Sequence, residues 1–95
     1  MHRTRQACML AAGVVLTIEA APTVGWSLSC VAGDERLELR GSGPIEQAFA
    51  RGPANCRVTL EAGEAPLAAT LTDGSGNRSR SQVSGVGSIM HLRSS

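Results

Sequence analysis

Apolar and polar residues alternate with a period of two along most of this chain, which is the pattern of half-buried β-strands. The clearest run is 55–61, in which Cys56, Val58 and Leu60 share one face while polar residues occupy the other. Gly, Pro, Asn or Asp separates each run from the next, and no useful window after residue 25 has the helical period. The sequence therefore predicts an all-β fold. Its seven candidate strands are 26–31, 34–40, 45–50, 55–61, 66–72, 78–83 and 86–93.

The size of the chain, 95 residues, fits one small domain. Hydrophobic residues make up 42% of the sequence and charged residues 18%, so the chain is apolar enough to fold rather than to remain disordered. No repeat or linker divides the part that follows residue 25. We expect a single domain over 26–93, built as a small β-sandwich or a closed small barrel of antiparallel strands.

The pairing of neighbouring strands can be tested by parity, because a slip of one residue turns every side chain of a strand to the other face. Every junction between successive runs admits a short loop that keeps the apolar residues on one face. A meander, in which each strand pairs with the next, is therefore consistent with the sequence. The pairs expected to lie opposite each other are Leu28 with Leu37, Leu39 with Ile45, Phe49 with Cys56, Leu60 with Leu67, Leu71 with Ser79, Leu67 with Val83, and Val83 with Val86.

The first residues have the composition of a secretory signal peptide. A short basic stretch with Arg3 and Arg5 precedes an apolar run over 7–18, and small residues follow. The run is too short to cross a bilayer as a helix, which needs about 20 residues. We expect residues 1–20 to be removed after Ala20, or alternatively a cut after Gly25, and a periplasmic or secreted protein with no transmembrane segment left. An uncleaved anchor and a buried N-terminal helix are the other interpretations.

Removal of this segment removes Cys8 and leaves Cys30 and Cys56, which in an exported domain are expected to form one disulfide. In a flat meander these two cysteines would lie about 14 Å apart, whereas a disulfide needs Cα atoms within about 7 Å. The sheet is therefore expected to fold over itself or to close. The two cysteines and His91 lack the tight spacing of a zinc site, so we expect no metal.

The chain lacks residues and motifs that several kinds of catalysis and binding require. The chain contains no Lys, which excludes Schiff-base lysines and P-loops. Two aromatic residues and a formal net charge of +1 argue against a nucleic-acid partner. There is no Gly-x-Ser-x-Gly elbow, and the paired carboxylates fall at strand ends or in a loop. We therefore expect no enzyme activity and no cofactor.

The segment Thr70-Leu71-Thr72-Asp73-Gly74-Ser75-Gly76-Asn77-Arg78-Ser79 resembles the late hairpin of secreted bacterial immunoglobulin-like modules. The resemblance covers about a tenth of the chain and implies a sandwich used for adhesion or as a spacer, without catalysis. Asp73, Ser75 and Asn77 alternate as the ligands of a calcium loop do, but Arg78 and Ser84 stand where that loop requires Gly and Glu. A plain hairpin loop is the favoured interpretation.

The last part of the chain carries Arg78, Arg80 and Arg93 and no acidic residue after Asp73. In the expected register Arg78 lies opposite His91, so these four basic side chains share one face. We expect this basic strip to contact an anionic partner, such as a lipid, a glycan or an envelope protein. The alternative is a solvated face whose arginines discourage pairing between sheet edges.

These observations predict an exported, non-catalytic binding or structural module. The first alternative is a small secreted enzyme inhibitor that presents a loop around Gly52 and Pro53. The second is a minimal hydrolase, which would have to use His91 because no other histidine follows the predicted cut.

Overall fold

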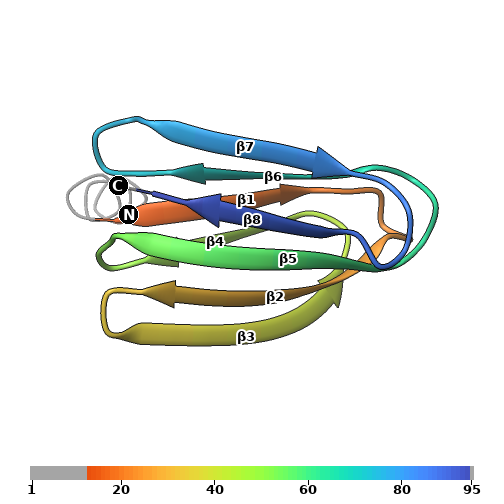
Figure 1. Ribbon diagram of the computed structural model, residues 1–95, viewed down its shortest axis with the longest axis horizontal. Coiled ribbons are helices and arrows are strands. Elements are labelled where there is room, and N and C mark those ends of the chain that lie inside the picture. The colour runs from red at the N-terminus through yellow and green to blue at the C-terminus, as the bar shows by residue number, and fades with distance from the viewer. Residues whose placement is uncertain (1–12, 95) are drawn as a thin grey trace, which may run out of the picture.

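The computed structural model describes residues 13–94, and in this part of the chain it contains eight antiparallel strands and no helix (Figure 1). The prediction of an all-β domain is therefore confirmed. The strands are β1 (Val14–Glu19), β2 (Gly25–Ala32), β3 (Glu35–Ser42), β4 (Ile45–Phe49), β5 (Ala54–Ala62), β6 (Leu67–Thr72), β7 (Arg78–Val83) and β8 (Ile89–Arg93).

The strands form two four-stranded sheets that pack face to face as a sandwich (Figure 1). Sheet A has the order β4-β1-β6-β7, and sheet B has the order β3-β2-β5-β8. Only β2–β3 and β6–β7 are hairpins, since every other connection carries the chain from one sheet to the other. No helix in the described residues has the length and apolar character needed to cross a membrane.

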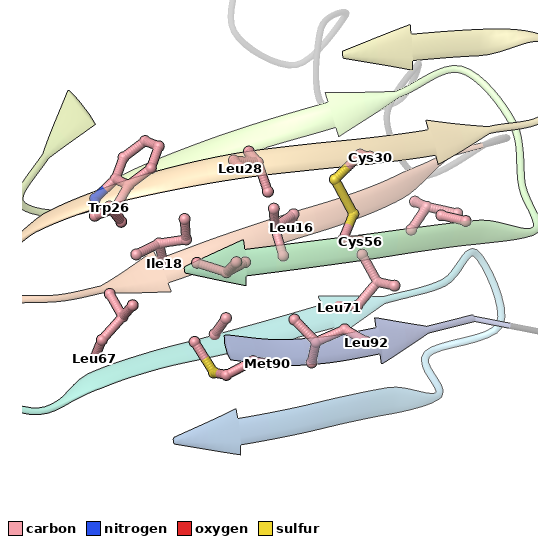
Figure 2. Packing of buried hydrophobic residues seen from close by; sticks show 14 of the residues in the cluster. Leu16, Ile18, Trp26, Leu28, Cys30, Cys56, Leu67, Leu71, Met90 and Leu92 are labelled. Carbon is pink, nitrogen blue, oxygen red and sulfur yellow. A yellow bond between two sulfur atoms is a disulfide. The ribbon is translucent and has the colours of Figure 1, made fainter. Parts of the chain in front are cut away.

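Alternate residues of all eight strands point between the sheets and form the core, part of which Figure 2 shows. Leucines from both sheets are almost completely buried, and each contributes roughly 1.5–3 kcal/mol to folding. Trp26 is also buried, and its Nε1–H donates a hydrogen bond of 2.9 Å to the carbonyl of Gly43. Gly41 lies opposite Trp26 in the ladder, and a Cβ there would come within 3.1 Å of the indole ring. The missing side chain therefore makes room for the indole.

An eighth strand comes from the segment predicted to be a signal peptide. Residues 14–19 form β1, which pairs with β4 on one side and β6 on the other and buries Val14, Leu16 and Ile18. The interpretation as a buried N-terminal helix has the burial right but the secondary structure wrong. Residues 1–12 lie outside the described residues. A cut after Ala20 or Gly25 would remove β1 from the middle of sheet A.

Several of the expected registers are wrong because the chain is not a meander. Leu71 lies opposite Ser79 and Leu67 opposite Val83, as predicted. The pairs Leu39–Ile45, Phe49–Cys56 and Leu60–Leu67 do not form, because in each case the two strands belong to different sheets. Val83 and Val86 do not pair either, because Val86 lies in the turn between β7 and β8, which belong to different sheets. In the β2–β3 hairpin Leu28 faces Leu39, while Leu37 faces Cys30, a shift of two residues. The parity argument tests only whether a residue points towards the core. A residue of the facing sheet also points towards the core, so parity does not show which strands pair.

The Cys30–Cys56 disulfide is confirmed, with an S–S distance of 2.02 Å and a Cα–Cα distance of 4.1 Å (Figure 2). The strands are folded into two layers, as expected, but the disulfide does not require this. The expected separation of the cysteines by three strand spacings is wrong, because they lie directly opposite each other on neighbouring strands β2 and β5. The chain passes through β3 and β4 and then returns beside β2. The disulfide thus joins the two central strands of sheet B and does not connect the two sheets.

Candidate binding face

The predicted basic strip is divided between the two sides of the sandwich. Arg78 and Arg80 point outward from β7 in sheet A, whereas His91 and Arg93 point outward from β8 in sheet B. The expected register between these strands is wrong, because β7 and β8 are edge strands of different sheets and form no ladder. The four residues therefore do not share one face. Their role in binding stays a prediction.

Arg78 and Arg93 do approach each other at one end of the seam between the sheets. Both line a hollow of about 90 Å³ with Asp73 and Asn77. The Asp73 carboxylate accepts hydrogen bonds from the backbone N–H groups of Ser75 and Asn77, at 2.9 and 3.0 Å. These bonds close the 73–77 loop in the way an Asx turn does. The loop therefore has the plain hairpin geometry that we favoured over a calcium loop.

The outer face of sheet B brings together residues from all four of its strands. Ser27, Ser29 and Val31 come from β2, and Asn55, Arg57 and Thr59 come from β5, because alternate residues of a strand share a face. The edge strand β3 adds Arg36, Glu38 and Arg40, and the edge strand β8 adds Ile89, His91 and Arg93.

Two adjoining hollows of about 410 and 330 Å³ occupy this face. Both are lined by Ser29 and Arg57, so the Arg57 side chain stands between them. The first extends towards Glu38 and Arg40 on β3, and the second towards His91 and Arg93 on β8. The middle of the face is low because Ser27, Ser29 and Thr59 are short, whereas the side chains at the two edges are long. We call these two hollows together the trough.

The charge on this face is positive. Arg36, Arg40, Arg57 and Arg93 outnumber Glu38 and Glu61, which gives a formal charge of +2 before His91 is counted. The Glu61 carboxylate accepts a hydrogen bond of 2.7 Å from the Ser27 hydroxyl. None of these four arginines has an ion pair among residues 13–94, where the one ion pair is Arg80–Glu19 at 3.6 Å on sheet A. Their guanidinium groups are therefore available to a ligand.

On the outer face of sheet B, His91 does not lie beside a serine. His91 lies opposite Arg57 and two strands away from Ser29, a separation of about 10 Å that is too long for a nucleophile–base hydrogen bond. No cluster of three metal-ligating side chains occurs in the described part of the chain.

The loop of the inhibitor alternative lies at the connection between β4 and β5. Residues 51–53 are exposed, and the carbonyl of Pro53 accepts a hydrogen bond of 3.2 Å from the N–H of Gly33. The Glu35 carboxylate accepts a second bond of 3.2 Å from the N–H of Ala50. The loop is thus held against the β2–β3 turn.

Sequence reasoning did not single out Arg36, Arg40 and Arg57. Each stands on the polar side of a predicted strand, which is the signal that could have drawn attention to it. The order of the strands was needed to bring them beside Arg93. Comparison of the chain with protein families, curated proteins and solved structures finds no match. The relationship to immunoglobulin-like modules therefore stays a prediction, because a two-sheet sandwich alone does not identify a family.

Proposed function

We propose that this protein is a non-catalytic binding module that contacts an anionic partner through the outer face of sheet B. The observation that carries the proposal is the trough, where Arg40, Arg57 and Arg93 stand around short hydroxyl side chains without acidic partners. Guanidinium groups form strong charge-assisted hydrogen bonds with carboxylates and phosphates. A hollow lined by several of them favours an anion over a neutral ligand.

We further propose that the protein works outside the cytoplasm, in the periplasm or the medium. The buried Cys30–Cys56 disulfide supports this proposal, because such bonds persist in oxidising compartments and are rare in the cytosol. If the protein keeps the fold described above, any processing of the N-terminus has to leave β1 in place. We therefore expect the exported protein to retain Val14–Glu19. N-terminal sequencing of exported protein tests this.

The binding proposal can be tested by NMR titration at low ionic strength with three anionic probes: inorganic polyphosphate, polygalacturonate and phosphatidylglycerol vesicles. We expect at least one probe to bind saturably and to shift amide signals of β2, β5 and β8. Added salt should weaken the binding, because exposed charges are screened within about 10 Å at 0.1 M salt.

The matched control uses the two outer faces. Arg40→Gln/Arg57→Gln should weaken binding, while Arg78→Gln/Arg80→Gln removes the same charge from sheet A and should leave it unchanged. The proposal is wrong if none of the three probes binds, or if the shifted signals lie on sheet A. The inhibitor alternative predicts a stoichiometric complex with one enzyme that depends on Arg51 and Pro53 and not on these arginines.

A further inference from the structure

The arginines of the trough follow a diagonal across sheet B. Arg40 lies in the row of Ser27 and Thr59, Arg57 lies one row further along, and Arg93 lies one row beyond that. From ladder spacings, the Cα atoms of Arg40 and Arg57 are about 12 Å apart, and those of Arg57 and Arg93 about 8 Å apart. The three cations therefore extend over about 20 Å of the sheet. A ligand that engages all three has to be an extended chain with repeated negative charges.

The surface between these cations carries groups that can form hydrogen bonds in both directions. The hydroxyls of Ser29 and Thr59 donate and accept, and the Asn55 amide does the same. The Ser27 hydroxyl accepts only, because it donates its proton to Glu61. Glu38 lines the first hollow beside Arg40, and a carboxylate only accepts. A chain of phosphates has no hydroxyl to offer these acceptors, and its charge is repelled by Glu38. A chain of acidic sugars has carboxylates for the arginines and hydroxyls for the acceptors.

The aromatic side chains of the described residues are not available for stacking. Trp26 and Phe49 are buried in the core at 2% and 5% exposure. A neutral sugar or an unpaired base would usually need such a ring as a platform. Recognition on this face therefore has to rely on charge and hydrogen bonds, with Val31 and Ile89 offering aliphatic contact to sugar C–H groups.

The shape of the face also favours a polymer over a membrane. The two hollows lie on either side of Arg57, between the long side chains of the edge strands β3 and β8, so the middle of the sheet is recessed except at Arg57. A bilayer surface is broad and would rest on those edge side chains. A single extended chain can enter the recess and reach Arg57.

We propose that the trough binds an extended acidic polysaccharide, of the uronic-acid type, along the line from Arg40 past Arg57 to Arg93. This proposal rests on the proposed function and names its ligand class. The polymer is held by carboxylate–guanidinium contacts at three points, and its hydroxyl groups bond to the side chains between them. Because each contact is exposed and individually weak, affinity depends on how many contacts one chain makes at once.

The experiment measures affinity for oligogalacturonates of increasing length by isothermal titration calorimetry at low ionic strength. We expect affinity to rise with length until the oligomer reaches from Arg40 to Arg93. Beyond that length, the affinity calculated per binding site on the oligomer should stay constant. The methyl-esterified hexamer, which lacks the negative charges, should not bind. Arg40→Gln/Arg57→Gln should weaken hexamer binding about tenfold, as expected for the loss of two exposed charge contacts. The control Arg78→Gln/Arg80→Gln should change it less than about twofold.

The remaining outcomes separate this inference from the proposed function. If polyphosphate or phosphatidylglycerol vesicles bind through Arg40 and Arg57 while oligogalacturonates do not, the proposed polysaccharide ligand is wrong. The proposal that the outer face of sheet B binds an anionic partner is then still supported. An affinity that does not depend on oligomer length also contradicts the polysaccharide proposal, because a single sugar would then be enough for binding. If no anion binds, or if both double variants reduce binding equally, both proposals are wrong. The thermal unfolding midpoint of each variant confirms that it is folded.

Discussion

Sheets A and B each contribute four strands to one core, yet they differ in how their centres are held and in what they present to solvent. In sheet B the central strands β2 and β5 are joined by a disulfide, whereas the central strands β1 and β6 of sheet A are held by packing and hydrogen bonds alone. Both sheets bury an apolar inner face. The comparison shows that this shared requirement fixes neither how the central strands are linked nor which residues the outer face carries.

The outer faces differ in charge and in relief. Sheet A presents Arg78 and Arg80 with Glu19 and Glu46, so its formal charge is zero, and Arg80 is paired with Glu19. Sheet B presents an excess of unpaired arginines around the trough. The arginines of sheet A are thus balanced by an equal number of carboxylates, and one of them is in an ion pair, whereas those of sheet B are in excess. This is why the proposed function depends on sheet B.

The largest expected effect concerns the centre of sheet A. A chain that begins at Ala21 lacks β1 and leaves β4 and β6 without their shared neighbour. Loss of Val14, Leu16 and Ile18 removes roughly 1.5–3 kcal/mol of burial free energy per side chain. The sum over the three side chains approaches the total stability of a small domain, about 5–15 kcal/mol. We expect this chain to show no cooperative thermal transition by circular dichroism. A transition like that of the full chain would contradict the role of β1.

The next effect concerns the centre of sheet B. Cys56→Ala removes the disulfide and should lower the free energy of unfolding by about 2–5 kcal/mol while the domain remains folded. Urea denaturation measures this loss, and intact mass with and without reductant should differ by two hydrogens in the unmodified protein. Cys30→Ala/Cys56→Ala is the control, because it removes both thiols. If both variants are as stable as the parent, sheet B does not depend on its covalent link.

The smallest effect on stability tests whether charge alone explains the difference between the outer faces. Glu19→Gln/Glu46→Gln removes one exposed ion pair and should change the free energy of unfolding by less than about 1 kcal/mol. It also gives the outer face of sheet A the formal charge of +2 that sheet B has. We expect no binding of oligogalacturonate to sheet A in an NMR titration, because that face lacks the trough. New binding there would show that charge without relief is sufficient.

The sequence predicted most of the strands but not their arrangement. Each of the seven expected runs contains a strand, because alternation and turn residues are local signals. β1 was overlooked for a different reason, since its overall hydropathy and its position resemble a signal peptide. Its alternation of buried Val14, Leu16 and Ile18 with Val15 and Thr17 has the same period as the other strands. Weighing that period against hydropathy would have identified it.

The candidate site could not be assembled from local pattern. The expected strip assumed that β7 and β8 pair, whereas the chain crosses between sheets after Val83. Loops of similar length connect strands within one sheet and between two, so loop length did not distinguish the two cases. Arg57 reaches the centre of a basic face only because β5 lies between β2 and β8. That neighbourhood depends on contacts between residues far apart in sequence.

The crossing connections also set the order in which this domain can assemble. The β2–β3 and β6–β7 hairpins join adjacent segments, and such hairpins form in about 1–10 μs. β1 is made first on the ribosome but has to wait for β4 and β6, since Leu16 pairs with Gln47 and Leu71. Topologies dominated by such distant pairings fold slowly, on the order of milliseconds to seconds. During that interval the facing edges of β4 and β6 are open to any extended segment nearby, including that of a neighbouring nascent chain.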